Sequence, residues 1–129
     1  MSDEQDPRKK RYYHGGDSGL QIGDYILPPS ETGKDNMIGL NPLRNKDRVY
    51  VTKDIAGAMF FASRSDSPMV YEVTPEGALE DDPDHKTKGI SYACRKAKIT
   101  ALHVVPPDVI QRNRQMMRAA PLAKKPEVR

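Results

Sequence analysis

Four carboxylates crowd into one short acidic segment of the chain, Leu79–His85 (LEDDPDH). Like charges this close repel one another, so such a cluster is either a solvated loop or a site that uses negative charge. Its potential metal ligands are Asp81, Asp82, Asp84 and His85. The twelve-residue pattern of a calcium loop is missing, however, and no second histidine lies at the short spacing that a zinc site uses. We therefore predict no metal site here.

Strand geometry separates these acids from one another. If the segment is extended, Glu80 and Asp82 face one way and Asp81 faces the other, because side chains alternate along a strand. Asp82 also precedes Pro83, which holds its backbone in the β region. Asp82 is therefore the better-fixed carboxylate and the stronger candidate for chemistry.

His14 and Tyr50 are ordinary residues alone and become suggestive through their neighbours. His14 is followed by Gly15 and Gly16, a pair that frees the backbone for a sharp turn or for the close approach of a ligand. Tyr50 is the centre of the segment RVYVT and is by default a core or cross-strand aromatic residue. Neither residue belongs to a local nucleophile motif such as a Ser-His-Asp or Cys-His signature.

The elements that must position these residues are short strands separated by turn residues. We predict strands at 12–14, 48–52, 69–73, 78–82, 90–93 and 98–105, a turn at 75–77 and an aperiodic loop at 30–47. The first strand ends at the glycine pair 15–16, where the chain either turns sharply or lets a ligand approach. One helix is expected to begin at Thr52 as its N-cap, and a second to run from Pro106 to about Ala120. One or two helices among strands this tightly spaced predict an α+β domain with mostly antiparallel pairing, in which the sheet can be split in two.

Length and composition limit the organisation of the protein. A chain of 129 residues with 36% apolar residues supports one lean domain, which we place at 12–120 between a flexible N-terminal arm, 1–11, and a flexible basic tail, 121–129. The absence of a long apolar segment predicts a soluble, cytoplasmic protein. Cys94 and His103 have no partner at a catalytic or metal-binding spacing, so we interpret both as structural.

The net charge of +3 belongs to the C-terminal end. Residues 112–129 hold six bases and one acid, a local charge of +5, which leaves −2 for residues 1–111. A nucleic-acid-binding interpretation would therefore depend on the tail and on the basic segment at 8–11. Neither GxGxxG nor GxxxxGK[ST] is present, so no standard phosphate loop explains a nucleotide site.

Three fragments, in this order and at these intervals, resemble the rifamycin ADP-ribosyltransferases, the Arr family. They are Tyr13-His14-Gly15, Val49-Tyr50-Val51-Thr52 opening a helix, and Glu80-Asp81-Asp82-Pro83-Asp84. Shorter pieces agree, namely Ile22-Gly23-Asp24, Tyr71-Glu72-Val73-Thr74-Pro75, Ser91-Tyr92 and Arg95. The likeness spans about residues 12–118, and its acidic fragment is the most specific part.

The resemblance implies a small split antiparallel sheet with a few short helices and an enzyme that cleaves the nicotinamide bond of NAD. It maps the catalytic histidine, tyrosine and aspartate onto His14, Tyr50 and Asp82. In that mapping His14 hydrogen-bonds a ribose hydroxyl, Gly15 lets the backbone contact the nicotinamide amide, Tyr50 stacks on the nicotinamide ring, and Asp82 stabilises the positive charge of the ribose. The implied NAD-binding residues are His14, Gly15, Tyr50, Thr52 and Ser91. NAD is then a co-substrate, with no metal required.

The acceptor is the open part of this interpretation. The family's histidine-glycine-threonine is here His14-Gly15-Gly16, and the segment from the acids to Ser91 is shorter than the family's. We expect a monomer that modifies a hydroxyl of a rifamycin-type antibiotic. The alternatives are a related enzyme acting on a protein or nucleic acid, and a non-catalytic module that binds an acidic partner through its basic tail.

Overall fold

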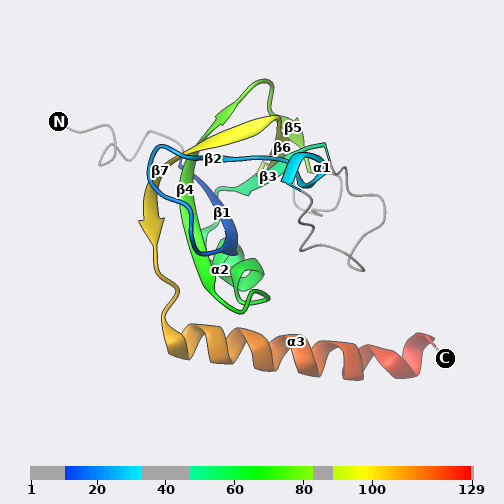
Figure 1. The fold of residues 1–129 in the computed structure, drawn as a ribbon. Helices are drawn as coiled ribbons and strands as arrows, with labels where there is room; N and C mark the ends of the chain where they lie inside the picture. The colour runs from blue at the N-terminus through cyan, green and yellow to red at the C-terminus, as the bar shows by residue number, and fades with distance from the viewer. Residues whose placement is uncertain (1–10, 33–46, 83–88, 129) are drawn as a thin grey trace.

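The chain forms one antiparallel sheet accompanied by helices (Figure 1). The computed structural model describes residues 11–32, 47–82 and 89–128, with residues 120–128 as backbone only. In chain order the elements are β1 (Tyr12–Asp17), β2 (Tyr25–Ile26), α1 (Pro29–Thr32), β3 (Val49–Thr52), α2 (Ile55–Ala62), β4 (Pro68–Glu76), β5 (Glu80–Asp81), β6 (Ser91–Cys94), β7 (Lys96–His103) and α3 (Pro107–Val128). The predicted α+β class and antiparallel pairing are confirmed.

The two halves of the sheet, β2-β7-β4-β1 and β3-β6-β5, are joined by one pair of residues on β1 and β3. The strand order is β2-β7-β4-β1-β3-β6-β5. β1 pairs with β4 along its whole length, but it pairs with β3 only where Tyr13 lies opposite Thr52. Beyond that pair β1 and β3 diverge, so the sheet splits at this point, as the resemblance implies.

The entry into α2 differs from the prediction. The N-cap is Asp54, whose Oδ1 accepts the N–H of Ala56 at 3.0 Å, and Thr52 is not the cap. Thr52 remains in the ladder opposite Ser91, so the helix cannot begin until the chain has left β3. Its hydroxyl instead accepts the N–H of Asp54 at 3.0 Å and shapes the exit from the strand.

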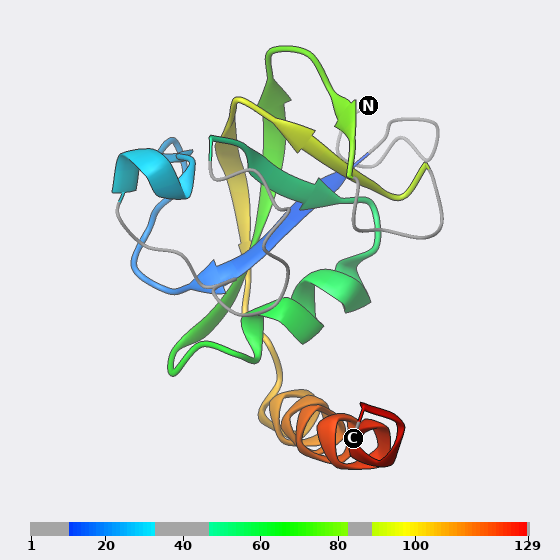
Figure 2. The ribbon, with the colours of Figure 1, turned by 90° about the vertical axis from the view of Figure 1, so that its right-hand side faces the viewer.

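The glycine pair after His14 neither ends the strand nor forms a sharp turn, which was one of the two roles predicted for it. β1 continues through both glycines to Asp17. A Cβ on Gly15 would lie 2.0 Å from the carbonyl oxygen of Ala58, because the backbone of α2 packs directly on β1 there. Figure 2 shows α2 between the sheet and α3, which is seen nearly end-on. Gly15 is therefore required by helix packing, whatever else it does.

Other boundaries move by a few residues. β4 extends to Glu76, so the turn predicted at 75–77 begins at Gly77, which has φ +85°. The strand predicted at 78–82 is limited to Glu80–Asp81, and α3 runs to Val128, past the predicted end near Ala120. The predicted N-terminal arm up to residue 10 lies outside the described residues, as do Pro83, Asp84 and His85.

Apolar side chains pack in two clusters. One is built from strand residues, namely Ile26, Val49, Val51, Tyr71, Val73, Cys94, Ala97 and Ile99. The other joins the sheet to α2 and α3 and comprises Ala58, Ala62, Val70 and Val105, with Tyr13, Ile55, Met59, Val109 and Ile110 against it. Burial raises the pKa of the Cys94 thiol to about 11, which agrees with a structural role.

Polar bonds fix α3 at its N-terminal half. Asn113, which is buried, donates to the hydroxyl of Ser63 at 3.2 Å. Arg114 donates to the carbonyls of Ser63 and Ser65 at 3.0 and 2.8 Å. In the described part of the chain, no helix combines the length and apolarity needed to cross a membrane.

We predict that Gly15→Ala destabilises the protein by about 1–3 kcal/mol, because the new methyl group meets helix backbone that cannot move aside cheaply. Urea unfolding followed by circular dichroism measures the change. Gly16→Ala is the matched control, since its Cβ would find no atom closer than His14 Nε2 at 3.5 Å. Equal stability of the two variants would contradict the proposed packing.

Candidate functional site

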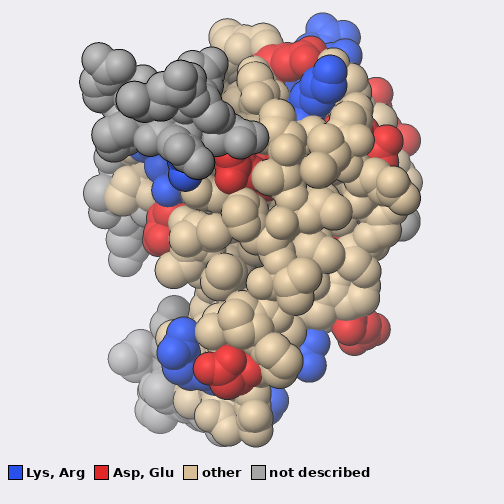
Figure 3. Space-filling view, turned by 90° about the vertical axis from the view of Figure 1, so that its left-hand side faces the viewer, with Lys and Arg blue, Asp and Glu red and all other residues tan. Residues whose placement is uncertain are grey.

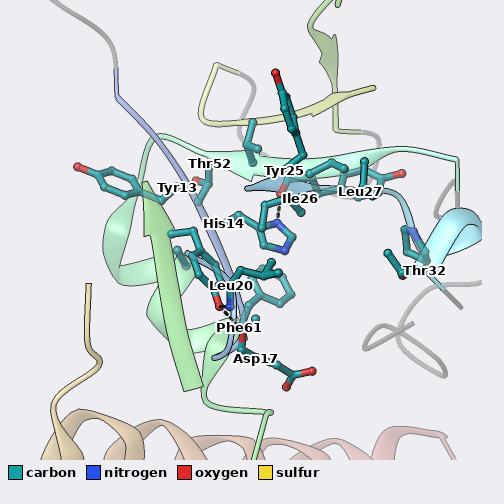
Figure 4. A pocket seen from close by; sticks show the side chains of 18 of the residues that line it. Tyr13, His14, Asp17, Leu20, Tyr25, Ile26, Leu27, Thr32, Thr52 and Phe61 are labelled. Atoms are coloured by element: carbon teal, nitrogen blue, oxygen red, sulfur yellow. Dashed lines mark hydrogen bonds between the residues drawn. The ribbon is translucent and has the colours of Figure 1, made fainter. Parts of the chain in front are cut away.

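A cavity of about 490 Å³ occupies the opening between β1 and β3 (Figure 4). Both strands contribute to its lining, together with the segment that leads from β1 through β2 to α1 and with Phe61 of α2. In Figure 4 β1 descends from Tyr13 towards Asp17, whereas β3 runs off to the side. The cavity therefore follows from the divergence of two strands that meet at one pair.

His14 bridges the two strands beside that meeting point. Its Nδ1 lies 2.9 Å from the backbone carbonyl oxygen of Tyr50. A carbonyl oxygen only accepts hydrogen bonds, so Nδ1 carries the proton and donates it. In the neutral ring Nε2 is then the acceptor nitrogen, and the ring itself lines the cavity.

Another part of the cavity wall is the segment between β1 and β2, which several hydrogen bonds hold in place. The hydroxyl of Tyr71 donates to the carbonyl of Asp17 and accepts the N–H of Leu20 at 3.4 Å. Further on, Gly23 donates its N–H to the carbonyl of Ile99 at 2.9 Å. These bonds hold Leu20 at the cavity, which its side chain lines together with Phe61 (Figure 4).

The register of β3, β6 and β5 sets the orientation of the acids. Tyr50 and Glu80 both lie opposite Ala93, so these three side chains share one face of the sheet. Asp82, one step beyond the β5 ladder, donates its N–H to the carbonyl of Ser91 at 3.2 Å. Its side chain continues the face of Glu80, while Asp81 alternates to the other.

Burial separates the two neighbouring aspartates as well. Asp82 is 3% exposed, whereas Asp81 lies at the surface. Thr52 is opposite Ser91, so Asp82 follows in the same row, two strands beyond β3. With about 4.8 Å between strands, its backbone is about 10 Å from that of Thr52. Asp82 is thus a buried acid close to the site but outside the cavity lining.

Arg48 brings a positive charge to the cavity. Its Nε donates to Glu80 Oε1 at 3.0 Å, and its Nη1 donates to the carbonyl of Asp47 at 3.2 Å. The hydrogen bond that Arg48 donates to Glu80 and the negative charge of that carboxylate raise the pKa of the guanidinium. Arg48 is therefore a permanent cation at the start of β3.

The structure brings together most of the residues that the sequence singled out. His14, Gly15, Tyr50, Thr52 and Ser91 all line the cavity, and Asp82 is bonded to one of them. His103 is elsewhere, paired with Glu72 at 3.0 Å. In the described ranges no three acidic, histidine or cysteine side chains are grouped as metal ligands.

Sequence reasoning missed several residues of the lining. Leu20, Leu27 and Phe61 supply apolar surface, and Arg48 supplies the charge. The two leucines lie in a stretch rich in turn residues, which shows no period. In the sequence Arg48 is the first residue of RVYVT, and opposite charge is the one signal that points to its pairing with the acidic segment.

The amino-acid sequence matches the family of rifampin ADP-ribosyl transferases over residues 12–104. The chain belongs to this family. The matched range extends from β1 to the end of β7 and contains every residue that lines the cavity, whereas α3 lies beyond it. A comparison with curated proteins gave no match. The resemblance carried by the histidine, tyrosine and acidic fragments is thereby confirmed at the level of the family.

We predict that His14 is held in the Nδ1-protonated form in this member of the rifampin ADP-ribosyl transferase family. Nitrogen-15 NMR of histidine-labelled protein at pH 8 should show a protonated Nδ1 and an unprotonated Nε2, because the Tyr50 carbonyl can bind only a donor. His103, whose Nε2 faces a carboxylate, provides a contrasting signal in the same spectrum. An Nε2-protonated His14 would contradict this assignment.

Proposed function

We propose that the protein transfers ADP-ribose from NAD to a hydroxyl of a rifamycin-type antibiotic and releases nicotinamide. The observation that carries the proposal is the meeting of His14 and Tyr50 at one cavity, in a chain that belongs to the rifampin ADP-ribosyl transferase family. The cavity volume lies within the range typical of small-molecule and cofactor sites.

His14 and Tyr50 bind and orient the donor in this proposal. The fixed ring of His14 presents Nε2 as an acceptor for a ribose hydroxyl, and the Tyr50 ring stacks on nicotinamide. Thr52, Ser91 and the backbone of Gly15 complete the contacts. Because His14 is held by the Tyr50 backbone, the two groups keep a constant separation, which lowers the entropic cost of orienting the ligand.

Asp82 supplies the negative charge that the chemistry needs. The bond between ribose C1 and the nicotinamide nitrogen breaks, and its electron pair leaves with neutral nicotinamide. Positive charge grows on the ribose, as in glycoside cleavage, and a buried carboxylate on the Tyr50 face of the sheet stabilises it. The acceptor oxygen forms the new bond to C1 and its proton passes to solvent. Contact with Asp82 requires the donor to lie across β3 and β6.

The rim of the cavity favours an apolar acceptor. Leu20 and Leu27 line the cavity and are each 39% exposed. Large apolar side chains left open at the mouth of a pocket are typical of a binding surface for an apolar molecule. On the face drawn in Figure 3, the Lys and Arg side chains of the described residues lie scattered among acids.

Incubation of the protein with NAD and rifampicin is expected to yield free nicotinamide and an antibiotic heavier by one ADP-ribose. Mass spectrometry and chromatography measure the two products. A parallel reaction with labelled NAD and a cell lysate detects transfer to protein or RNA. Label in macromolecules without a rifampicin adduct would contradict the proposed acceptor, and the absence of any nicotinamide release together with no binding of NAD would contradict the enzyme.

Asp82→Asn is expected to lower turnover about 100-fold or more while the protein stays folded, because the amide cannot balance positive charge on the ribose. Asp81→Asn is the matched control, since this acid is exposed and faces the other side of the strand. It should retain activity within about twofold. Steady-state kinetics with circular dichroism as the check on folding makes the comparison, and equal losses would disprove the choice of Asp82.

A further inference from the structure

Arg48 is the only side chain of fixed positive charge among the described residues that line the cavity. We propose that it binds the diphosphate of the donor, a role that rests on the proposed function. Phosphate oxygens are good acceptors for a guanidinium, which presents five N–H donors in a planar fork. Glu80 and the Asp47 carbonyl each take one of these donors in the bonds that the structure gives Arg48.

The cavity lining carries opposite charges along the two diverging strands. We call the part of the lining along β1 the β1 arm and the part along β3 the β3 arm. The β1 arm ends at Asp17, whose carboxylate accepts a hydrogen bond from Ser65. The β3 arm begins at Arg48, directly before Val49. A diphosphate carries two negative charges, so it is repelled at the first arm and attracted at the second. The charge of the lining therefore selects the direction in which a dinucleotide extends.

Distances along β3 agree with this direction. Arg48 precedes Tyr50 by two residues, about 7 Å along the backbone. Its bond to Glu80, which lies on the same face of the sheet as Tyr50, places the Arg48 side chain on that side as well. In NAD the diphosphate is bonded to the ribose that carries nicotinamide. With the nicotinamide ring on Tyr50 and this ribose at His14, the phosphates therefore lie next to the ribose, within reach of β3. The Arg48 side chain as a whole is 34% exposed, which leaves part of it accessible to a ligand.

Glu80 is a positioning residue for Arg48. It lies across Ala93 from Tyr50, and its carboxylate holds the guanidinium through Nε. Because Nη1 is bonded to the Asp47 carbonyl, Nη2 is the nitrogen that remains for a ligand. The Glu80 side chain is 53% exposed, so solvent screens its charge and it cancels only part of the attraction for phosphate. The acidic segment thereby has two uses, with Asp82 and Glu80 on one face.

The experiment measures dissociation constants by calorimetry for NAD, ADP-ribose and the phosphate-free nicotinamide riboside. Arg48→Gln should raise the dissociation constants of NAD and ADP-ribose about tenfold, which is the effect of losing one charged hydrogen bond. The dissociation constant of nicotinamide riboside should change by no more than about twofold. Arg48→Lys keeps the charge but loses the fork, so its loss should be smaller. Arg64→Gln, the same change at an exposed position outside the lining, should have no effect.

The outcomes separate this inference from the proposed function. If the unaltered protein binds no NAD, the proposed function itself fails. If the unaltered protein binds NAD and Arg48→Gln binds it equally well, only the role of Arg48 is overturned. The same holds if Arg48→Gln loses as much affinity for nicotinamide riboside as for NAD.

A double-mutant cycle tests the part played by Glu80. Glu80→Ala should raise the dissociation constant of NAD about threefold when Arg48 is present and should have no effect in the Arg48→Gln variant. Additive losses, or tighter binding of NAD by Glu80→Ala, would contradict a positioning role. Thermal unfolding of each variant confirms that the protein remains folded.

Discussion

The single backbone pair between Tyr13 and Thr52 determines where the site lies. A complete ladder between β1 and β3 would close the sheet and leave no room for a ligand. Because the strands separate after one pair, the carbonyl of Tyr50 takes a hydrogen bond from the His14 side chain. The same bond satisfies a backbone group, fixes the ring of His14 and keeps the opening at a defined width.

The packing of α2 on β1 maintains this divergence. Gly15 lets the backbone of α2 lie directly on the strand, and Ala58 and Ala62 continue the contact into the second apolar cluster. β1 is thus held by β4 and α2, while β3 pairs with β6, which in turn pairs with β5. Each strand therefore pairs with a neighbour of its own in the sheet, and this pairing holds β1 and β3 apart at the cavity.

The sequence predicted the parts of the site that depend on local pattern. Alternation along an extended segment was enough to separate Asp82 from Asp81, and the β6 register and the burial of Asp82 agree with that separation. Prediction from the sequence was wrong where tertiary contacts overrode a local signal. The glycine pair indicated a turn, but the demand at Gly15 comes from a helix more than forty residues away. Thr52 looked like an N-cap, but its place in the β3 ladder delays the helix to Asp54.

Charge around the cavity links the acidic segment to the strands that face it. Glu80 pairs with Arg48 and Asp82 is bonded to Ser91, so the segment LEDDPDH is tied to the site at two points of the described chain. The sequence could show the crowding of these acids but not their partners, since the partners come from β3 and β6.

The most direct test of the account is a crystal structure of the protein with NAD bound. The account predicts nicotinamide on the Tyr50 ring in the opening between β1 and β3, a ribose hydroxyl on His14 Nε2, and the diphosphate directed along β3. NAD bound outside this opening, or bound in it with its diphosphate towards Asp17, would contradict it.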